Sequence, residues 1–189
     1  MKSSFAEFPT LNFKITWRPF QLNPKMPKEG MDRNLYLETK FGGKENALKT
    51  YKSINEMGLK NNIHFQFEKI KKTPNSFASH KLLALANKFD KQTEVVETIF
   101  YSYFIEGVDI GNLNELIKIS KQHKIFDKNT ENYLVSSEDK KSLLGEESHA
   151  RELGIQGVPC FIVNKEIVLF GAQDKDNFVN IFKSIVNDN

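Results

Sequence analysis

The sequence contains a single cysteine, Cys160, whose thiol is the strongest nucleophile that the chain offers. A thiolate attacks a disulfide and forms a mixed disulfide when its pKa is low and solvent reaches it. One thiol cannot close an intrachain disulfide, so intramolecular dithiol cycling by these 189 residues is excluded. The alternative role is structural, because an unpaired cysteine is among the most buried residue types. Both interpretations of Cys160 stay open at this point.

Other side chains offer weaker chemistry. Arg18 could hold an acidic group of a substrate, and Phe20 could line the same cleft. A surface or interdomain ion pair is the alternative interpretation of Arg18, and both stay open here. One cysteine and four scattered histidines lack the spacing of metal ligands, so no metal site is predicted. Three carboxylates are expected on a solvated helix face rather than as an acid–base pair: Glu146, Glu147 and Glu152.

The elements that would position Cys160 lie near the end of the chain. Residues 158–163 form a continuous apolar run, which predicts a strand buried on both faces. A short turn at Asn164-Lys165 makes the next strand, residues 167–170, its antiparallel neighbour. A last amphipathic helix is predicted to follow. Its inner side would carry Phe178, Ile181, Phe182, Ile185 and Val186.

The rest of the chain predicts one more strand and a helical middle. Residues 11–17 alternate apolar and polar side chains, which is typical of a half-buried strand. Asp32 predicts a helix start and Gly42-Gly43 its end. Four or five further helices are expected, and the last of them starts near Ser137 and ends at Gly154.

Composition limits the class of protein. The 189 residues suffice for one compact domain, or for one core carrying an insertion. No apolar run approaches the roughly 18 residues of a membrane-spanning helix, and 12% aromatic residues exclude a disordered tail. The net charge of +3 is mild, so no nucleic-acid partner is predicted, and the basic run at 69–72 is expected to be a solvated face. The first residues have no signal-peptide core, which predicts a cytoplasmic protein.

Four stretches, in this order and at this spacing, resemble the DsbA-like family of thioredoxin-fold proteins. Within it the sequence is most similar to the FrnE-type oxidoreductases, and 2-hydroxychromene-2-carboxylate isomerases and kappa-class glutathione transferases are more distant relatives. The stretches Asn23-Pro24 and Met31-Asp32-Arg33 favour the FrnE branch. The four stretches are Trp17–Pro24, Thr73–Asn75 with His80, Phe104–Ile110, and Leu153–Phe161 with Phe170–Gln173.

The resemblance implies an α/β chain with a thioredoxin-like fold and a large inserted helical domain. Residues 1–28 would form part of the thioredoxin-like half, 29–140 the helical insertion and 141–189 the remainder. The family's first strand and its Cys-x-x-Cys motif, or a Ser or Cys variant, have no counterpart in this sequence, so no catalytic residue is assigned. Loss of a central strand leaves unpaired backbone groups at about 1–3 kcal/mol each. We therefore expect the native polypeptide to start upstream of Met1.

The same resemblance implies a substrate platform at Val158 and Pro159, with a cis peptide bond between them, and places Cys160 beside it as a candidate redox thiol. The first expected function is thiol–disulfide exchange on a protein or small-molecule disulfide, with dithiol chemistry inactive in this chain. The second is a glutathione-dependent isomerase or transferase, and no other cofactor is expected. The third is a redox-silent interaction module that forms a homodimer by exchanging a strand.

Overall fold

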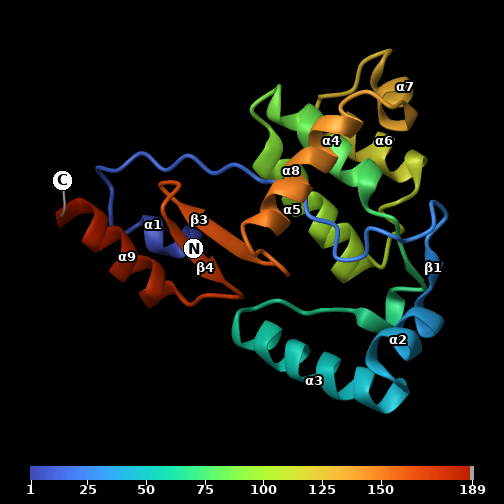
Figure 1. The fold of residues 1–189 in the computed structure, drawn as a ribbon, viewed down its shortest axis with the longest axis horizontal. Coiled ribbons are helices and arrows are strands. Elements are labelled where there is room, and N and C mark those ends of the chain that lie inside the picture. The colour runs from blue at the N-terminus through green and yellow to red at the C-terminus, as the bar shows by residue number, and fades with distance from the viewer. Residues whose placement is uncertain (188–189) are drawn as a thin grey trace. The chain divides into compact units, whose positions relative to one another are not determined.

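The computed structural model describes residues 1–187, which fold as two compact units (Figure 1). Unit 1 combines Met1–Leu22 with the chain from Glu146 onward, and unit 2 is Asn23–Gly145. The two units divide at 22/23 and 145/146, whereas the family resemblance implied boundaries at 28/29 and 140/141. Unit 1 contains the elements around Cys160, and unit 2 contains the helical middle of the chain.

Unit 1 is built on a β-hairpin and a long helix. Its elements are α1 (Lys2–Phe5), the second half of α8 (Lys140–Glu152), β3 (Cys160–Val163), β4 (Ile167–Phe170) and α9 (Lys175–Asn187). The two strands pair antiparallel, with Ile162 opposite Val168, which confirms the predicted hairpin. Asn164 and Lys165 both have positive φ angles (49° and 66°), and the backbone N–H of Glu166 donates to Val163 O at 3.1 Å. Left-handed pairs of this kind form the tightest hairpin turns.

The core of unit 1 is aromatic. Phe178 and Phe182 of α9 are buried, and the Phe161 ring of β3 meets Phe178 edge-on at 5.0 Å between centroids. One turn further along the same face of α9, the stacked rings of Phe5 and Phe13 lie against Phe182. The predicted inner face of the last helix therefore forms this core through Phe178 and Phe182, but Val186, predicted on the same face, is 45% exposed. Helix α1 packs along the same helix (Figure 1).

The predicted strand at residues 11–17 is wrong as an element of a sheet. Its side chains do alternate, with Phe13, Ile15 and Trp17 half-buried and the polar residues between them exposed. The backbone runs without regular structure, because no strand in the described part of the chain lies beside it to form a ladder. An alternating pattern records which side chains are buried, whereas a strand also needs a neighbouring backbone.

The prediction that residues 158–163 are buried on both faces is also wrong. The face with Phe161 packs on α9, whereas Ile162 and Val168 on the opposite face are 49% and 43% exposed. Phe170, at the end of β4, is 58% exposed. A continuous apolar run therefore marks a strand that packs on one face only, and the other face of the hairpin is exposed.

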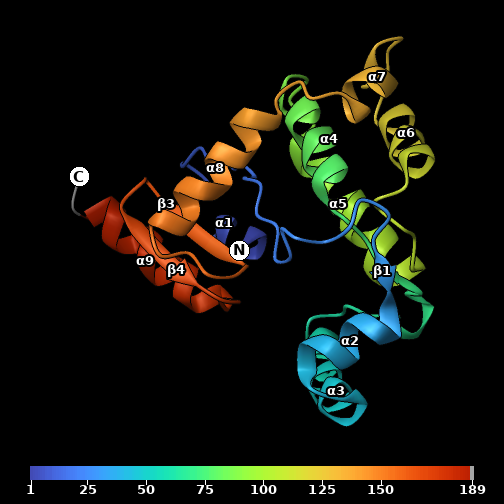
Figure 2. The ribbon, with the colours of Figure 1, turned by 45° about the vertical axis from the view of Figure 1, so that its right-hand side comes forward.

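Unit 2 is mostly helical, with one short ladder. Its elements are β1 (Met31–Asp32), α2 (Arg33–Phe41), α3 (Lys44–Lys60), the 3-10 turn η1 (Phe67–Lys69), β2 (Lys72–Thr73), α4 (Phe77–Asn87), α5 (Gln92–Tyr101), the π-helical turn η2 (Ser102–Glu106), α6 (Leu113–Gln122), α7 (Thr130–Val135) and the first half of α8. Strands β1 and β2 pair antiparallel. Figure 2 shows α2 lying against α3.

Local signals account for the helix ends of unit 2. Asp32 caps α2 by accepting from the backbone N–H groups of Asn34 and Leu35 at 2.9 and 3.1 Å. Gly107 closes η2 in the left-handed conformation. Helices α4, α5, α6 and α7 then bury one apolar cluster, which includes Leu82, Val95, Ile99, Leu116, Ile125 and Leu134. None of the helices between residues 1 and 187 has the length and apolar character needed to cross a membrane.

Candidate functional site

The loop between α8 and β3 is the best-formed candidate site. The last turn of α8 closes on Gly154, whose φ of +81° turns the chain away from the helix. The peptide bond between Val158 and Pro159 is cis. Pro159 O accepts from the backbone N–H of Gly171 at 2.8 Å, which holds the loop against the far end of the hairpin. Two segments separated by the hairpin turn therefore meet here.

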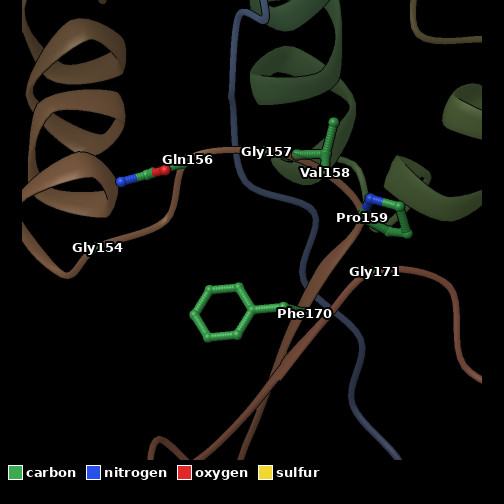
Figure 3. Close-up of a pocket in the computed structure, with 7 residues that line it drawn as sticks. All are labelled: Gly154, Gln156, Gly157, Val158, Pro159, Phe170 and Gly171. Carbon is green, nitrogen blue, oxygen red and sulfur yellow. The ribbon is translucent and has the colours of Figure 1, made fainter.

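These segments enclose an open depression of about 410 Å³. Figure 3 shows the Phe170 ring projecting beneath the loop, with Val158 and Pro159 at the start of β3. Val158 is 48% exposed. The lining residues are Gly154, Gln156, Gly157, Val158, Pro159, Phe170 and Gly171. The surface is mainly apolar. Of these residues, Val158 and Pro159 were predicted as site residues, and the other five lie in the motifs that carry the family resemblance.

The backbone of Val158 is free. Neither its N–H nor its C=O makes a hydrogen bond within residues 1–187. A half-exposed residue with both backbone groups unpaired is a template for an extended peptide, which would pair with it as a strand pairs with its neighbour.

Cys160 is half-buried at the first position of β3, opposite Phe170. It follows Pro159 directly but does not line the depression. Burial raises the pKa of the Cys160 thiol, so the thiol is protonated at neutral pH. The structure therefore gives Cys160 the environment of a weak nucleophile.

Arg18 and Phe20 are both held by α8 rather than lining the depression. Arg18 Nη1 donates to Glu146 Oε2 at 3.0 Å, and its side chain is 71% exposed. The Phe20 ring lies 4.4 Å from the guanidinium carbon of Arg151. Arg151 Nη2 in turn donates to Glu147 Oε1 at 2.7 Å.

Glu147 differs from the predicted solvated position. It is 5% exposed, because the Arg151 side chain covers it and neutralises its charge. The same Arg151 nitrogen donates to Gln21 O at 2.7 Å. These contacts tie the segment after residue 17 to the last turns of α8, immediately before the candidate loop. No group of His, Cys, Asp and Glu side chains suited to a metal ion occurs among the described residues.

Comparisons with known proteins agree with this geometry. The family model of the DSBA-like thioredoxin domain matches residues 2–183. A crystal structure of a probable DsbA oxidoreductase from Streptomyces coelicolor superposes with a TM-score of 0.87 at 18% sequence identity, covering 100% of this chain and 82% of that one. No protein with a curated description matches significantly. The likeness in structure shows a common fold, and the family match over nearly the whole chain shows that the protein belongs to the DSBA-like thioredoxin domain family.

Proposed function

We propose that the loop Gly154–Pro159 binds the substrate of a thiol–disulfide oxidoreductase, as an extended segment that carries a thiol or disulfide. The unpaired backbone of Val158, beside an apolar depression, is the observation that carries this proposal. The N–H and C=O groups would fix the substrate's main chain, and Phe170 would contact an apolar side chain next to its sulfur. The family match supports the assignment of thiol–disulfide chemistry.

The chemistry itself needs a second sulfur. In exchange, a thiolate attacks one sulfur of the substrate disulfide, and the other sulfur leaves as a thiolate. A second thiolate then attacks the mixed disulfide at the sulfur of the first, closes a new disulfide with it and releases the remaining substrate sulfur as a thiolate. These residues supply one thiol, Cys160, with a raised pKa. We therefore assign substrate binding to this chain and expect no dithiol turnover from the 189 residues alone. A cytoplasmic location remains part of this proposal.

The test measures binding of a fluorescent cysteine-containing peptide, with its thiol blocked by methylation, by fluorescence polarisation. Phe170→Ser removes an exposed ring from the depression. A ring contact of about 55 Å² corresponds to roughly 1.4 kcal/mol, or about tenfold weaker binding. Val168→Ser is the matched control, because Val168 lies two residues earlier on the same open face but outside the depression. Equal affinities for the two variants, or no saturable binding to the wild type, would refute the site.

Glutathione is the candidate small-molecule thiol for the same depression. A volume of about 410 Å³ lies within the range of small-ligand sites. Glutathione that displaces the peptide in the same assay, together with loss of glutathione binding in Phe170→Ser, would favour a glutathione-dependent isomerase or transferase. If neither reduced nor oxidised glutathione displaces the peptide, the substrate is an extended polypeptide.

A second function, as a redox-silent interaction module, is favoured by the outer edge of β3. Because Gly171 N–H donates to Pro159 O, the backbone groups of Cys160 and Ile162 point away from β4. No strand of the described chain covers them, and the open face beside them is apolar. A second copy could pair there and form a homodimer. Light scattering tests this function: Ile162→Lys should convert a dimer to a monomer, and a monomeric wild type would refute it.

A further inference from the structure

Unit 2 contains a buried arginine whose charge has no carboxylate partner. Arg33, the first residue of α2, is 8% exposed. Its guanidinium donates to Thr73 Oγ1 at 3.0 Å, to the Tyr51 hydroxyl at 2.5 Å and to the Tyr103 hydroxyl at 3.4 Å. The guanidinium carbon also lies 5.2 Å from the centre of the Tyr51 ring. All of these partners are neutral, so the positive charge stays uncompensated, whereas buried charges are normally paired.

A second cation, Lys40, lies about two turns further along the same helix. Lys40 Nζ donates to the Tyr36 hydroxyl at 2.8 Å, and Asn23 Nδ2 donates to the same oxygen at 2.9 Å. The Tyr36 ring lies 5.7 Å from the Arg33 guanidinium carbon and 5.3 Å from Lys40 Nζ. Neither cation pairs with a carboxylate anywhere in residues 1–187.

Hydrogen-bond donors outnumber acceptors around this hydroxyl. The Tyr36 oxygen already accepts two bonds, and its own O–H finds no acceptor among the described residues. The ammonium group of Lys40 has two further N–H groups, and Asn23 offers a second amide hydrogen. Tyr36 and Asn23 are half-buried and Lys40 is exposed, so a small ligand can reach the group from outside. Two positive charges with spare donors and no acid are complementary to an anion.

We propose that the donors around the Tyr36 hydroxyl, namely Lys40, Asn23 and the phenol itself, bind a small oxyanion, a phosphate or carboxylate group, with Arg33 behind them supplying buried positive charge. The site would be held in advance of binding, because the Asp32 cap and the bond from Arg33 N–H to Lys71 O fix the start of α2. The proposal does not depend on the proposed function, since all of its residues lie in unit 2 and the substrate loop lies in unit 1.

Isothermal titration calorimetry of the full chain tests this site, with sodium phosphate and sodium acetate as separate titrants against sodium chloride at matched ionic strength. Saturable heat with phosphate or acetate, and none with chloride, is expected. Tyr36→Phe keeps both cations and the ring but removes the hydroxyl, and Lys40→Gln removes the exposed charge. Each variant should weaken binding at least about tenfold.

Lys49→Gln on α3 is the matched control, because it removes one exposed positive charge with no contact to Tyr36. Circular dichroism of each variant checks that the fold is intact. Binding of phosphate alone would assign a phosphate group, and binding of acetate alone would assign a carboxylate. Equal heats in chloride, or equal loss of affinity in Lys49→Gln and Lys40→Gln, would show general charge screening and overturn the proposal.

Discussion

Lys81 lies entirely inside unit 2, where it joins α4 to the end of α7. Its side chain has 0% exposure, and its ammonium donates to Tyr133 O and, at 2.8 Å, to Ser136 O. The nitrogen also lies 4.5 Å from the centre of the Tyr133 ring. Lys81 thus supplies a charged donor to two carbonyl groups at the end of α7, in addition to the bonds that Ser136 donates to Tyr133 O.

We predict that Lys81→Met, which keeps the side-chain volume, lowers the free energy of unfolding by about 2–4 kcal/mol. A hydrogen bond from a charged donor contributes about 1.5–3 kcal/mol, and two main-chain carbonyls lose theirs. Removal of the ammonium group offsets part of this loss, because burial penalises its charge and lowers the pKa of Lys81. The net effect remains destabilising, because Ser136 O loses the bond from the ammonium and Tyr133 O keeps only its bonds from the N–H and hydroxyl of Ser136.

Urea denaturation followed by far-ultraviolet circular dichroism measures the effect. Lys88→Met is the control, because Lys88 is an exposed lysine near the same tyrosine ring and forms only a surface ion pair with Asp139. It should change the free energy of unfolding by less than about 1 kcal/mol. Hydrogen exchange should accelerate at the amides of α7 in the Lys81 variant alone. Free energies of unfolding that agree within about 0.5 kcal/mol for the two variants would refute the argument, since this difference is below the usual contribution of a hydrogen bond.

Three further predictions concern single residues. Burial raises the pKa of Cys160, so iodoacetamide should modify it more slowly than free glutathione at pH 7, with a rate that still rises above pH 8.5, about the ordinary cysteine pKa. The pKa of Asp139 is lowered, mainly by a tyrosine hydroxyl that donates to it at 2.8 Å. The ionised Asp139 therefore adds stability above its unfolded-state pKa, and this contribution is lost as pH falls through the lower folded-state pKa. Asparagine tolerates the positive φ at this position. Asp139→Asn should therefore flatten the acid limb of the plot of stability against pH. Gly107→Ala should destabilise the chain by more than Gly42→Ala, because a Cβ at Gly107 would lie 2.6 Å from a main-chain oxygen and one at Gly42 meets nothing within 4 Å.

Each of these predictions has a clear contrary result. Alkylation of Cys160 that reaches a plateau below pH 7 would mean a thiolate stabilised by its surroundings rather than a buried thiol. An acid limb that stays as steep in Asp139→Asn would mean that other carboxylates cause the acid unfolding. Equal melting temperatures for Gly107→Ala and Gly42→Ala would mean that the backbone at Gly107 relaxes freely. Circular dichroism at neutral pH is the common control for folding.

Local features of the sequence were sufficient for the start of α2, the end of η2 and the turn of the hairpin, whereas α8 is shorter at both ends than the predicted helix from Ser137 to Gly154. Asp32 and Gly107 act on backbone groups within a few residues of themselves, and Asn164-Lys165 needs only its own left-handed turn. The candidate loop was also identifiable, because the motif around Val158 lies in one continuous stretch. In each of these cases the interacting groups are close in the chain.

The tertiary structure alone decided which side chains are buried and which backbone edges stay free. Lys81 and Glu147 look like solvated charges in the sequence, but partners 52 and 4 residues away, at a helix end and on a neighbouring turn, bury them. The alternation of apolar and polar residues at 11–17 correctly indicated which side chains are buried. It could not indicate that no neighbouring strand pairs with this segment. The donors around Tyr36 come from residues between 23 and 40. The buried charge behind them is that of Arg33, whose guanidinium donates to Tyr51 and Tyr103, far away in the sequence. Sequence periodicity describes the environment of one segment at a time, whereas burial, pairing and charge balance depend on what a distant segment places beside it.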